Sequence, residues 1–196
     1  MQGFKKFGGE EIQDLGLYVR NYMLDHENVV LSVGCDSDEH KRQDLYAIAV
    51  CFYHIGCGGH IVFKREWVPK KNVGRKISHV EERLWEEVER SKAVADYLES
   101  ILSDVIRRKT TSELVSEGYD PTQNKLVEVH VDFNPNPTTP VKASKKKKTM
   151  KRSTTNRSNT LHAAAVGYLV GFGYRVKTKP DAWAASCAAD LMVREK

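Results

Sequence analysis

Two aspartates stand where stretches with the composition of buried strands come to an end. Asp36 closes the apolar stretch "NVVLSVGCD", and Asp132 lies near the end of "KLVEVHVDFNP". In an open α/β sheet, ligands bind outside the carboxyl ends of parallel strands, so both acids are expected to face one crevice. An aspartate at a strand end is also a common turn former, which gives each residue alone a purely structural explanation.

A third acid, Glu87, interrupts the apolar face of a long helix predicted over residues 78–108. That face is formed by Leu84, Val88, Ser91, Ala95, Leu98 and Leu102, which recur at helical spacing. A carboxylate in such a place is costly unless it is paired or binds a metal ion. An ion pair with Arg83 or Arg90 and a role as metal ligand would both explain Glu87, and the adjacent Glu86 is the alternative ligand.

The stretch "KPDAWAASCAAD", residues 179–190, has an aspartate near each end and mostly small residues between them. Asp181 follows Pro180, and an acid beside a proline at a helix start complements the helix dipole, so we interpret Asp181 as a cap. Asp190 lies nine residues later, on the same side as Ser186. The small residues let this helix approach a sheet closely and carry Asp190 into the crevice. Asp181 remains the alternative ligand.

Together these side chains predict an oxygen-rich site. Its four acids, from two strands and two helices, are Asp36, Asp132, Glu87 and Asp190. Carboxylate oxygens suit hard cations, so the sequence predicts Mg²⁺ or Mn²⁺ rather than zinc. The residues that could favour zinc, Cys51, His54, Cys57 and His60, have a spacing that matches none of the common four-ligand patterns.

A strongly basic segment follows the strand that carries Asp132. Residues 142–157, "KASKKKKTMKRSTTNR", hold eight Lys or Arg residues and no acid. Clustered cations bind nucleic acid by releasing counterions from its phosphates. The residues expected to contact phosphates are Lys145, Lys146, Lys147, Lys148, Lys151 and Arg152. A solvated loop is the other explanation, and the two are compatible.

Hydrophobic periodicity and turn signals predict the elements that must position these residues. A helix is predicted over residues 9–26, followed by three strands, the long helix, a strand, a helix, a strand and a last helix. The stretch "GCGG" predicts a hairpin between the second and third strands, because glycine accepts positive φ. This order predicts an α/β fold in which a mixed sheet has helices on its faces. We interpret the three tryptophans, Trp67, Trp85 and Trp183, as core residues.

The composition is that of a soluble globular chain. Its 196 residues are 40% hydrophobic with a net charge of +5, and they fit a single domain over residues 1–196 with a basic insert at about 136–157. Four cysteines without regular spacing are expected to be reduced thiols. The start of the chain lacks a signal-peptide core, and no apolar run approaches the roughly 18 residues of a membrane span. A cytoplasmic location is therefore expected.

Five blocks of the sequence carry a family resemblance. They are "VGCDSD" (33–38), "RLWEEVERS" (83–91), "VHVDFNP" (129–135), "RSN" (157–159) and "GYLVGFGYRVKTKPDAWAASCAAD" (167–190). In these blocks the chain resembles the YkuK-like family of predicted ribonuclease H-like nucleases, over roughly residues 29–193. The resemblance implies a ribonuclease H-like fold with a five-stranded mixed sheet, three antiparallel strands followed by two parallel ones, and helices on both faces. The long basic insert departs from the family.

The resemblance also implies a function. The residues at the positions of the family's catalytic and metal-binding acids are Asp36, Glu87, Asp132 and Asp190, which would hold two divalent ions. The implied activity is hydrolysis of phosphodiester bonds in RNA, RNA–DNA hybrid or DNA. A catalytically inactive nucleic-acid-binding module, or a nuclease-like subunit of a complex, is the alternative. The chain lacks the G-x-x-x-x-G-K-[ST] loop of nucleotide hydrolases and the G-x-S-x-G nucleophile elbow.

Overall fold

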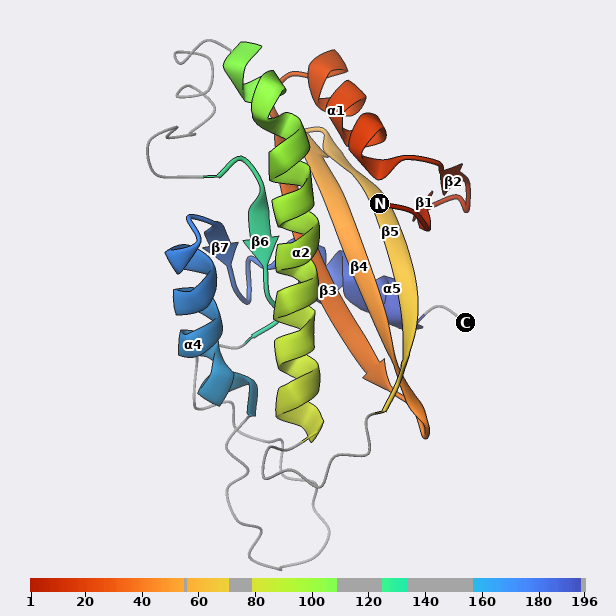
Figure 1. Ribbon diagram of the computed structural model, residues 1–196, viewed down its shortest axis with the longest axis vertical. Helices are drawn as coiled ribbons and strands as arrows, with labels where there is room; N and C mark the ends of the chain where they lie inside the picture. Colours follow the sequence, from red (N-terminus) through yellow and green to blue (C-terminus); the bar gives the residue numbers. More distant parts are fainter. Residues whose placement is uncertain (55, 71–78, 109–124, 134–156, 195–196) are drawn as a thin grey trace, which may run out of the picture.

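The structure is a computed structural model that describes residues 1–54, 56–70, 79–108, 125–133 and 157–194. Within them, seven strands form one mixed sheet flanked by helices (Figure 1). The strands are β1 Phe4–Lys6, β2 Glu11–Ile12, β3 Val29–Glu39, β4 Gln43–His54, β5 Gly58–Pro69, β6 Glu128–His130 and β7 Arg175–Lys177. The helical segments are α1 Leu15–Asp25, α2 His79–Arg108, α4 Arg157–Gly171, the π-helix η1 Ala184–Ala189 and α5 Asp190–Arg194.

The strands lie in the order β2-β1-β5-β4-β3-β6-β7. β3, β4 and β5 are antiparallel neighbours, whereas β6 pairs with β3 and β7 with β6 in parallel. The predicted arrangement of three antiparallel and two parallel strands is therefore confirmed, as is the hairpin at "GCGG", where Gly56 and Gly58 have positive φ. The predicted number of five strands is wrong, because β1 and β2 extend the sheet beyond β5.

The N-terminal helix begins at Leu15, later than the prediction of residues 9–26. Its start is set by Asp14, whose carboxylate accepts hydrogen bonds from the backbone N–H groups of Gly16 at 2.8 Å and Leu17 at 3.2 Å. Satisfying these otherwise free N–H groups fixes a helix start. The residues before the cap form β1 and β2, so Ile12, an apolar position of the predicted helix, belongs to a strand.

Each face of the central strands has its own helical cover. α2 crosses one face, where Val88 joins Val33 and Cys35 of β3 in the main core (Figure 1). The opposite face carries η1 and α5, and alanines of η1 pack there on Ala49 and Cys51 of β4. Because side chains alternate along a strand, odd-numbered residues of β3 face α2 and even-numbered residues face η1.

Two of the three tryptophans lie at the surface. Trp85 is partly buried against the main core, but Trp67 is 52% exposed and Trp183 is 38% exposed. The interpretation of Trp67 and Trp183 as core residues is therefore wrong. Across the part of the chain that the structure describes, no helix combines the length and the apolar character needed to pass through a bilayer.

Candidate functional site

The first two predicted acids lie level with each other on β3 and just beyond β6. The parallel pairing of the two strands sets Gly34 opposite His130. Continued for two residues along each chain, this register brings Asp36 level with Asp132 on the face that carries η1. β6 pairs with β3 only as far as His130, so both acids lie just past the point where this pairing ends. Asp36 was predicted at the end of its strand. That prediction is wrong, because β3 continues to Glu39 and Asp36 lies inside it.

Glu87 reaches the same region from the opposite face. It is 4% exposed, which confirms its predicted place on the buried side of α2. The Ser37 hydroxyl donates a hydrogen bond to Glu87 Oε1, and Arg83 Nη1 donates to the Ser37 carbonyl at 2.6 Å and to its hydroxyl at 2.7 Å. The contact to Arg83 is thus made through Ser37. Arg90 pairs with the partly exposed Glu86 at 3.7 Å. Of the two adjacent glutamates, Glu87 is therefore the one that faces the sheet.

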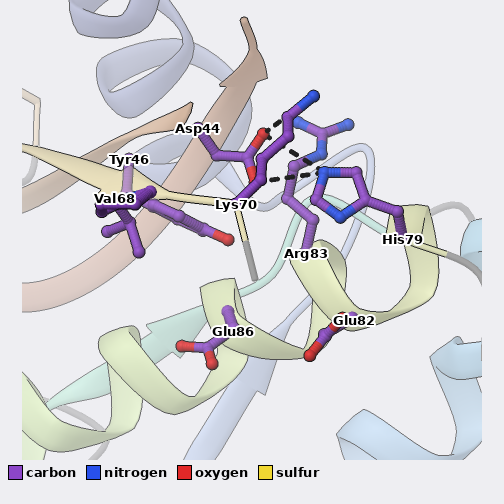
Figure 2. A pocket seen from close by; sticks show the side chains of 9 residues that line it. Asp44, Tyr46, Val68, Lys70, His79, Glu82, Arg83 and Glu86 are labelled. Carbon is purple, nitrogen blue, oxygen red and sulfur yellow. Dashed lines mark hydrogen bonds and ion pairs between the residues drawn. The ribbon is translucent and has the colours of Figure 1, made fainter. Parts of the chain in front are cut away.

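Charged side chains fix the first turns of α2 against the sheet (Figure 2). The carboxylate of the buried Asp44 of β4 lies 3.2 Å from His79 Nε2 and forms an ion pair with Lys70 at 3.9 Å. Figure 2 shows the Arg83 side chain beside His79 in this pocket. The contact of Asp44 with His79 ties the first turn of α2 to β4, and the contacts of Arg83 with Ser37 tie the next turn to β3, which places Glu87 against β3.

The last helical segment lies directly against β3. At Gly34, a Cβ atom would lie 2.4 Å from the backbone N of Ala185 and 2.6 Å from the backbone C of Ala184, so only glycine permits this contact. The Ala184 N–H donates to His130 Nδ1 at 3.0 Å, which ties the segment to β6. The predicted close approach is therefore confirmed. The segment starts later than predicted, and Asp181 is exposed before it. The interpretation of Asp181 as its cap is wrong, because no side chain caps the start of η1. The segment opens with a π-helix, a form frequently found at functional sites.

Asp132 and Asp190 both contact cationic side chains. The Ser186 hydroxyl donates to Asp132 Oδ1 at 2.6 Å, and Lys179 Nζ lies 2.8 Å from the same oxygen. Arg194 lies 2.7 Å from Asp190 Oδ1. Ser186 of η1 thus joins the segment that ends in Asp190 to the acid that follows β6.

The four acids influence one another electrostatically. Burial raises the pKa of Asp36 to about 7, and the charges of Asp132 and Asp190 also act to raise it. Burial likewise raises the pKa of Glu87 well above its ordinary range, and the charge of Asp36 adds to that effect. Nearby like charges disfavour ionisation, so these effects require the acids to lie close together. Asp36 thus lies within electrostatic range of Asp132 and Asp190, and Glu87 within that of Asp36 and Asp132. We call these four residues the acid cluster.

The chemistry of this cluster fits a hard divalent cation, since all four donors are carboxylates. Lys179 and Arg194 supply positive charge to Asp132 and Asp190. With the side chains in these positions, no three acidic, histidine or cysteine residues within the described ranges are close enough together to hold one metal ion.

Sequence reasoning missed Ser37 and Lys179. Both lie inside the blocks that carry the family resemblance, Ser37 next to Asp36 and Lys179 next to Pro180. Which acid each one contacts depends on how α2 and the last helix cross the sheet, and no local pattern encodes that. The predicted phosphate-contacting residues, Lys145, Lys146, Lys147, Lys148, Lys151 and Arg152, lie outside the described residues.

Comparison with protein-family models identifies the family. The model described as "Ribonuclease H-like" matches residues 14–194, a range that includes all four acids. The chain therefore belongs to the ribonuclease H-like family. No curated protein and no solved structure matches the chain.

Proposed function

We propose that this ribonuclease H-like protein is a metal-dependent nuclease. Its catalytic and metal-binding residues are Asp36, Glu87, Asp132 and Asp190, and its cofactor is a pair of Mg²⁺ or Mn²⁺ ions. The proposal is supported by the ribonuclease H-like match, whose range includes all four acids, and by the place of Asp36, which is level with Asp132 just past the end of β6 and within electrostatic range of Asp132 and Asp190. Such ions, when bound, activate a water and stabilise the leaving oxygen of a phosphodiester.

The protein's own residues prepare the acids for this role. Ser37 donates to one oxygen of Glu87 and leaves the other free of that bond, and Arg83 holds Ser37 in place. The Ser186 hydroxyl likewise donates to one oxygen of Asp132, Oδ1. Partners of this kind orient metal ligands, and their loss typically lowers metal affinity or activity about 10–100-fold.

Nucleic acid is the substrate class that we propose. The acids are useful for phosphodiester hydrolysis only with bound cations, and the basic residues 142–157 follow Asp132 closely in the sequence. RNA, an RNA–DNA hybrid and DNA all carry the phosphodiester that this chemistry requires. RNA, hybrid and DNA substrates of the same nucleotide sequence are therefore compared in one assay.

The test is cleavage of these substrates with Mn²⁺, by the wild type and by a matched pair of variants. Glu87→Gln removes the charge of the buried acid, whereas Glu86→Gln removes that of its partly exposed neighbour. Since loss of an outer partner alone costs about 10–100-fold, we expect Glu87→Gln to lower the cleavage rate by more than about 100-fold. Glu86→Gln should cleave like the wild type. Equal rates for the two variants would remove Glu87 from the site.

One observation favours the second candidate, a nucleic-acid-binding module without catalysis. Lys179 and Arg194 already contact two of the four acids, and within the described residues no three potential ligands are spaced to hold an ion. Binding of Mn²⁺ measured by calorimetry separates the two candidates. A wild-type protein that binds oligonucleotides but takes up no Mn²⁺ and cleaves nothing would be the binding module.

A further inference from the structure

A cavity of about 910 Å³ lies on the sheet face that carries η1, away from the acid cluster. Its floor is formed by side chains of β3 and β6, among them Ser32, Glu128 and His130, and its walls include Tyr53 and Trp183. Along the strands, Ser32 is four residues from Asp36 and His130 is two residues from Asp132. At about 3.3 Å per residue, the floor lies about 7–13 Å from the acids. The contact of η1 with Gly34 stands between the cavity and Asp36.

Two large aromatic side chains are exposed at this cavity. Tyr53 is 45% exposed and Trp183 is 38% exposed. The Trp183 ring is held over the β4–β5 hairpin, where its edge would lie 3.4 Å from a Cβ at Gly59, the residue paired with Tyr53. Both aromatic residues thus lie in the walls of one cavity, where their faces can receive a planar group.

The floor of the cavity offers polar groups for the edge of such a ligand. The Glu128 carboxylate lies 3.4 Å from both His130 Nε2 and Arg175 Nη1, and these partners lower its pKa although burial opposes the shift. Ser32 is 2% exposed, and its side chain also lines the cavity. Glu128 is therefore an acceptor, and Ser32 is a donor or an acceptor.

This combination selects among ligand classes. The lining holds two acids, Glu128 and Asp181, and one lysine, Lys177, so its charge disfavours a phosphate group. A planar heterocycle with an exocyclic amino group would stack on the aromatic rings and donate to the carboxylate, as cytosine does to acidic side chains. The volume is within the range of ordinary small-molecule sites.

We propose that this cavity binds an unpaired nucleobase, stacked on Trp183 and Tyr53 with its edge on Glu128 and Ser32. The proposal deepens the proposed nuclease function, on which it rests, because it gives a substrate strand a second attachment beside the acids. The base can belong to a strand or to a free nucleotide, and the chemistry of recognition is the same for both.

The test measures binding in the presence of a chelator, so that cleavage plays no part. Fluorescence anisotropy follows a labelled single-stranded oligocytidylate of about eight nucleotides, within the usual range of single-strand sites. Calorimetry follows cytidine monophosphate. The variant is Trp183→Leu, and the matched control is Trp67→Leu, which removes another exposed tryptophan outside the cavity.

Stacking on one aromatic ring strengthens binding about 5- to 150-fold. We therefore expect Trp183→Leu to weaken oligonucleotide binding by a factor in that range and Trp67→Leu to leave it unchanged. If Trp183→Leu weakens the binding of both the oligonucleotide and cytidine monophosphate, the cavity binds any accessible cytosine. If it weakens the binding of the oligonucleotide alone, the cavity binds a base within a strand. Equal binding by the two variants, or no binding by the wild type, overturns the proposal.

The fold of each variant is checked by thermal unfolding. If Trp183→Leu is unfolded, Tyr53→Leu takes its place with the same expectation. The outcome is separable from that of the proposed function. A wild type that binds the oligonucleotide through Trp183 but fails to cleave it with Mn²⁺ would contradict the nuclease proposal and leave the base-binding cavity standing.

Discussion

Replacing Asp36 by Asn should stabilise the metal-free protein, and by an amount that grows with pH. Asp36 is partly buried in β3, and burial together with the charges of Asp132 and Asp190 raises its pKa from 3.8 to about 7. The folded state therefore binds this proton more tightly than the unfolded state does. It follows that the wild type is stabilised at low pH and loses that stability as the pH rises from about 4 to beyond 7.

The size of the effect follows from the two pKa values. With 3.8 in the unfolded chain and about 7 in the folded one, ionisation of Asp36 costs about 1.5 kcal/mol at about pH 5 and about 4 kcal/mol at about pH 8. An asparagine does not titrate, and the cost of burying its amide is the same at both pH values. The stability difference between Asp36→Asn and the wild type should therefore increase by about 2.5 kcal/mol over this interval.

The assay is urea unfolding of both proteins in a chelator, at about pH 5 and about pH 8. A matched control is Asp38→Asn, which neutralises an exposed acid two residues further along β3. Its stability difference from the wild type should not grow in the same way. Taking each variant against the wild type at the same pH cancels the titration of all other groups, provided that their surroundings are unchanged.

A stability difference for Asp36→Asn that is flat between the two pH values would refute the reasoning. It would mean that Asp36 is ionised in the folded protein at ordinary cost, so that neither its burial nor the neighbouring acids penalise its charge. A difference of the opposite sign would mean that Lys179 or another cation already compensates the charge of Asp36.

Two further predictions concern the surroundings of the site. Gly34→Ala should destabilise the protein by about 1–3 kcal/mol or more, since its Cβ would meet the backbone of Ala185 at 2.4 Å, and urea unfolding measures this. If the basic segment contacts phosphates, changing Lys145 to Lys148 to serine should lower the salt slope of oligonucleotide binding by about 0.7–0.9 for each lost contact. Identical slopes for the variant and the wild type would leave the segment a solvated spacer.

The parts of the fold with a strong periodic signal could be predicted from the sequence. The central strands and the long helix have many apolar positions at regular spacing, so their type and order followed directly. The burial of Glu87 and the close approach of the last helix could also be predicted, because both depend on which face of one helix a residue occupies.

Other features depend on contacts that local patterns do not contain. β1 and β2 have only three and two residues, too few for alternation to distinguish a strand from a helix. The π-helical turns of η1 arise in an alanine-rich segment that packs on Gly34, and such a sequence is equally typical of an ordinary helix. The exposed positions of Trp67 and Trp183 depend on which parts of the sheet the last helix covers.

The shortness of β6 explains how acids from two faces of one sheet can act together. Glu87 lies on the side of α2, whereas Asp36 lies on the side of η1, and a continuous ladder between β3 and β6 would separate them. Pairing with β3 stops at His130, whereas bonding to β7 continues beyond it, since the Val131 N–H donates to the carbonyl of Lys177, the last residue of β7, at 3.0 Å. The gap next to Asp36 is therefore a product of the strand lengths. In the proposed site, carboxylates from the two faces meet a common ion beside this end of β6.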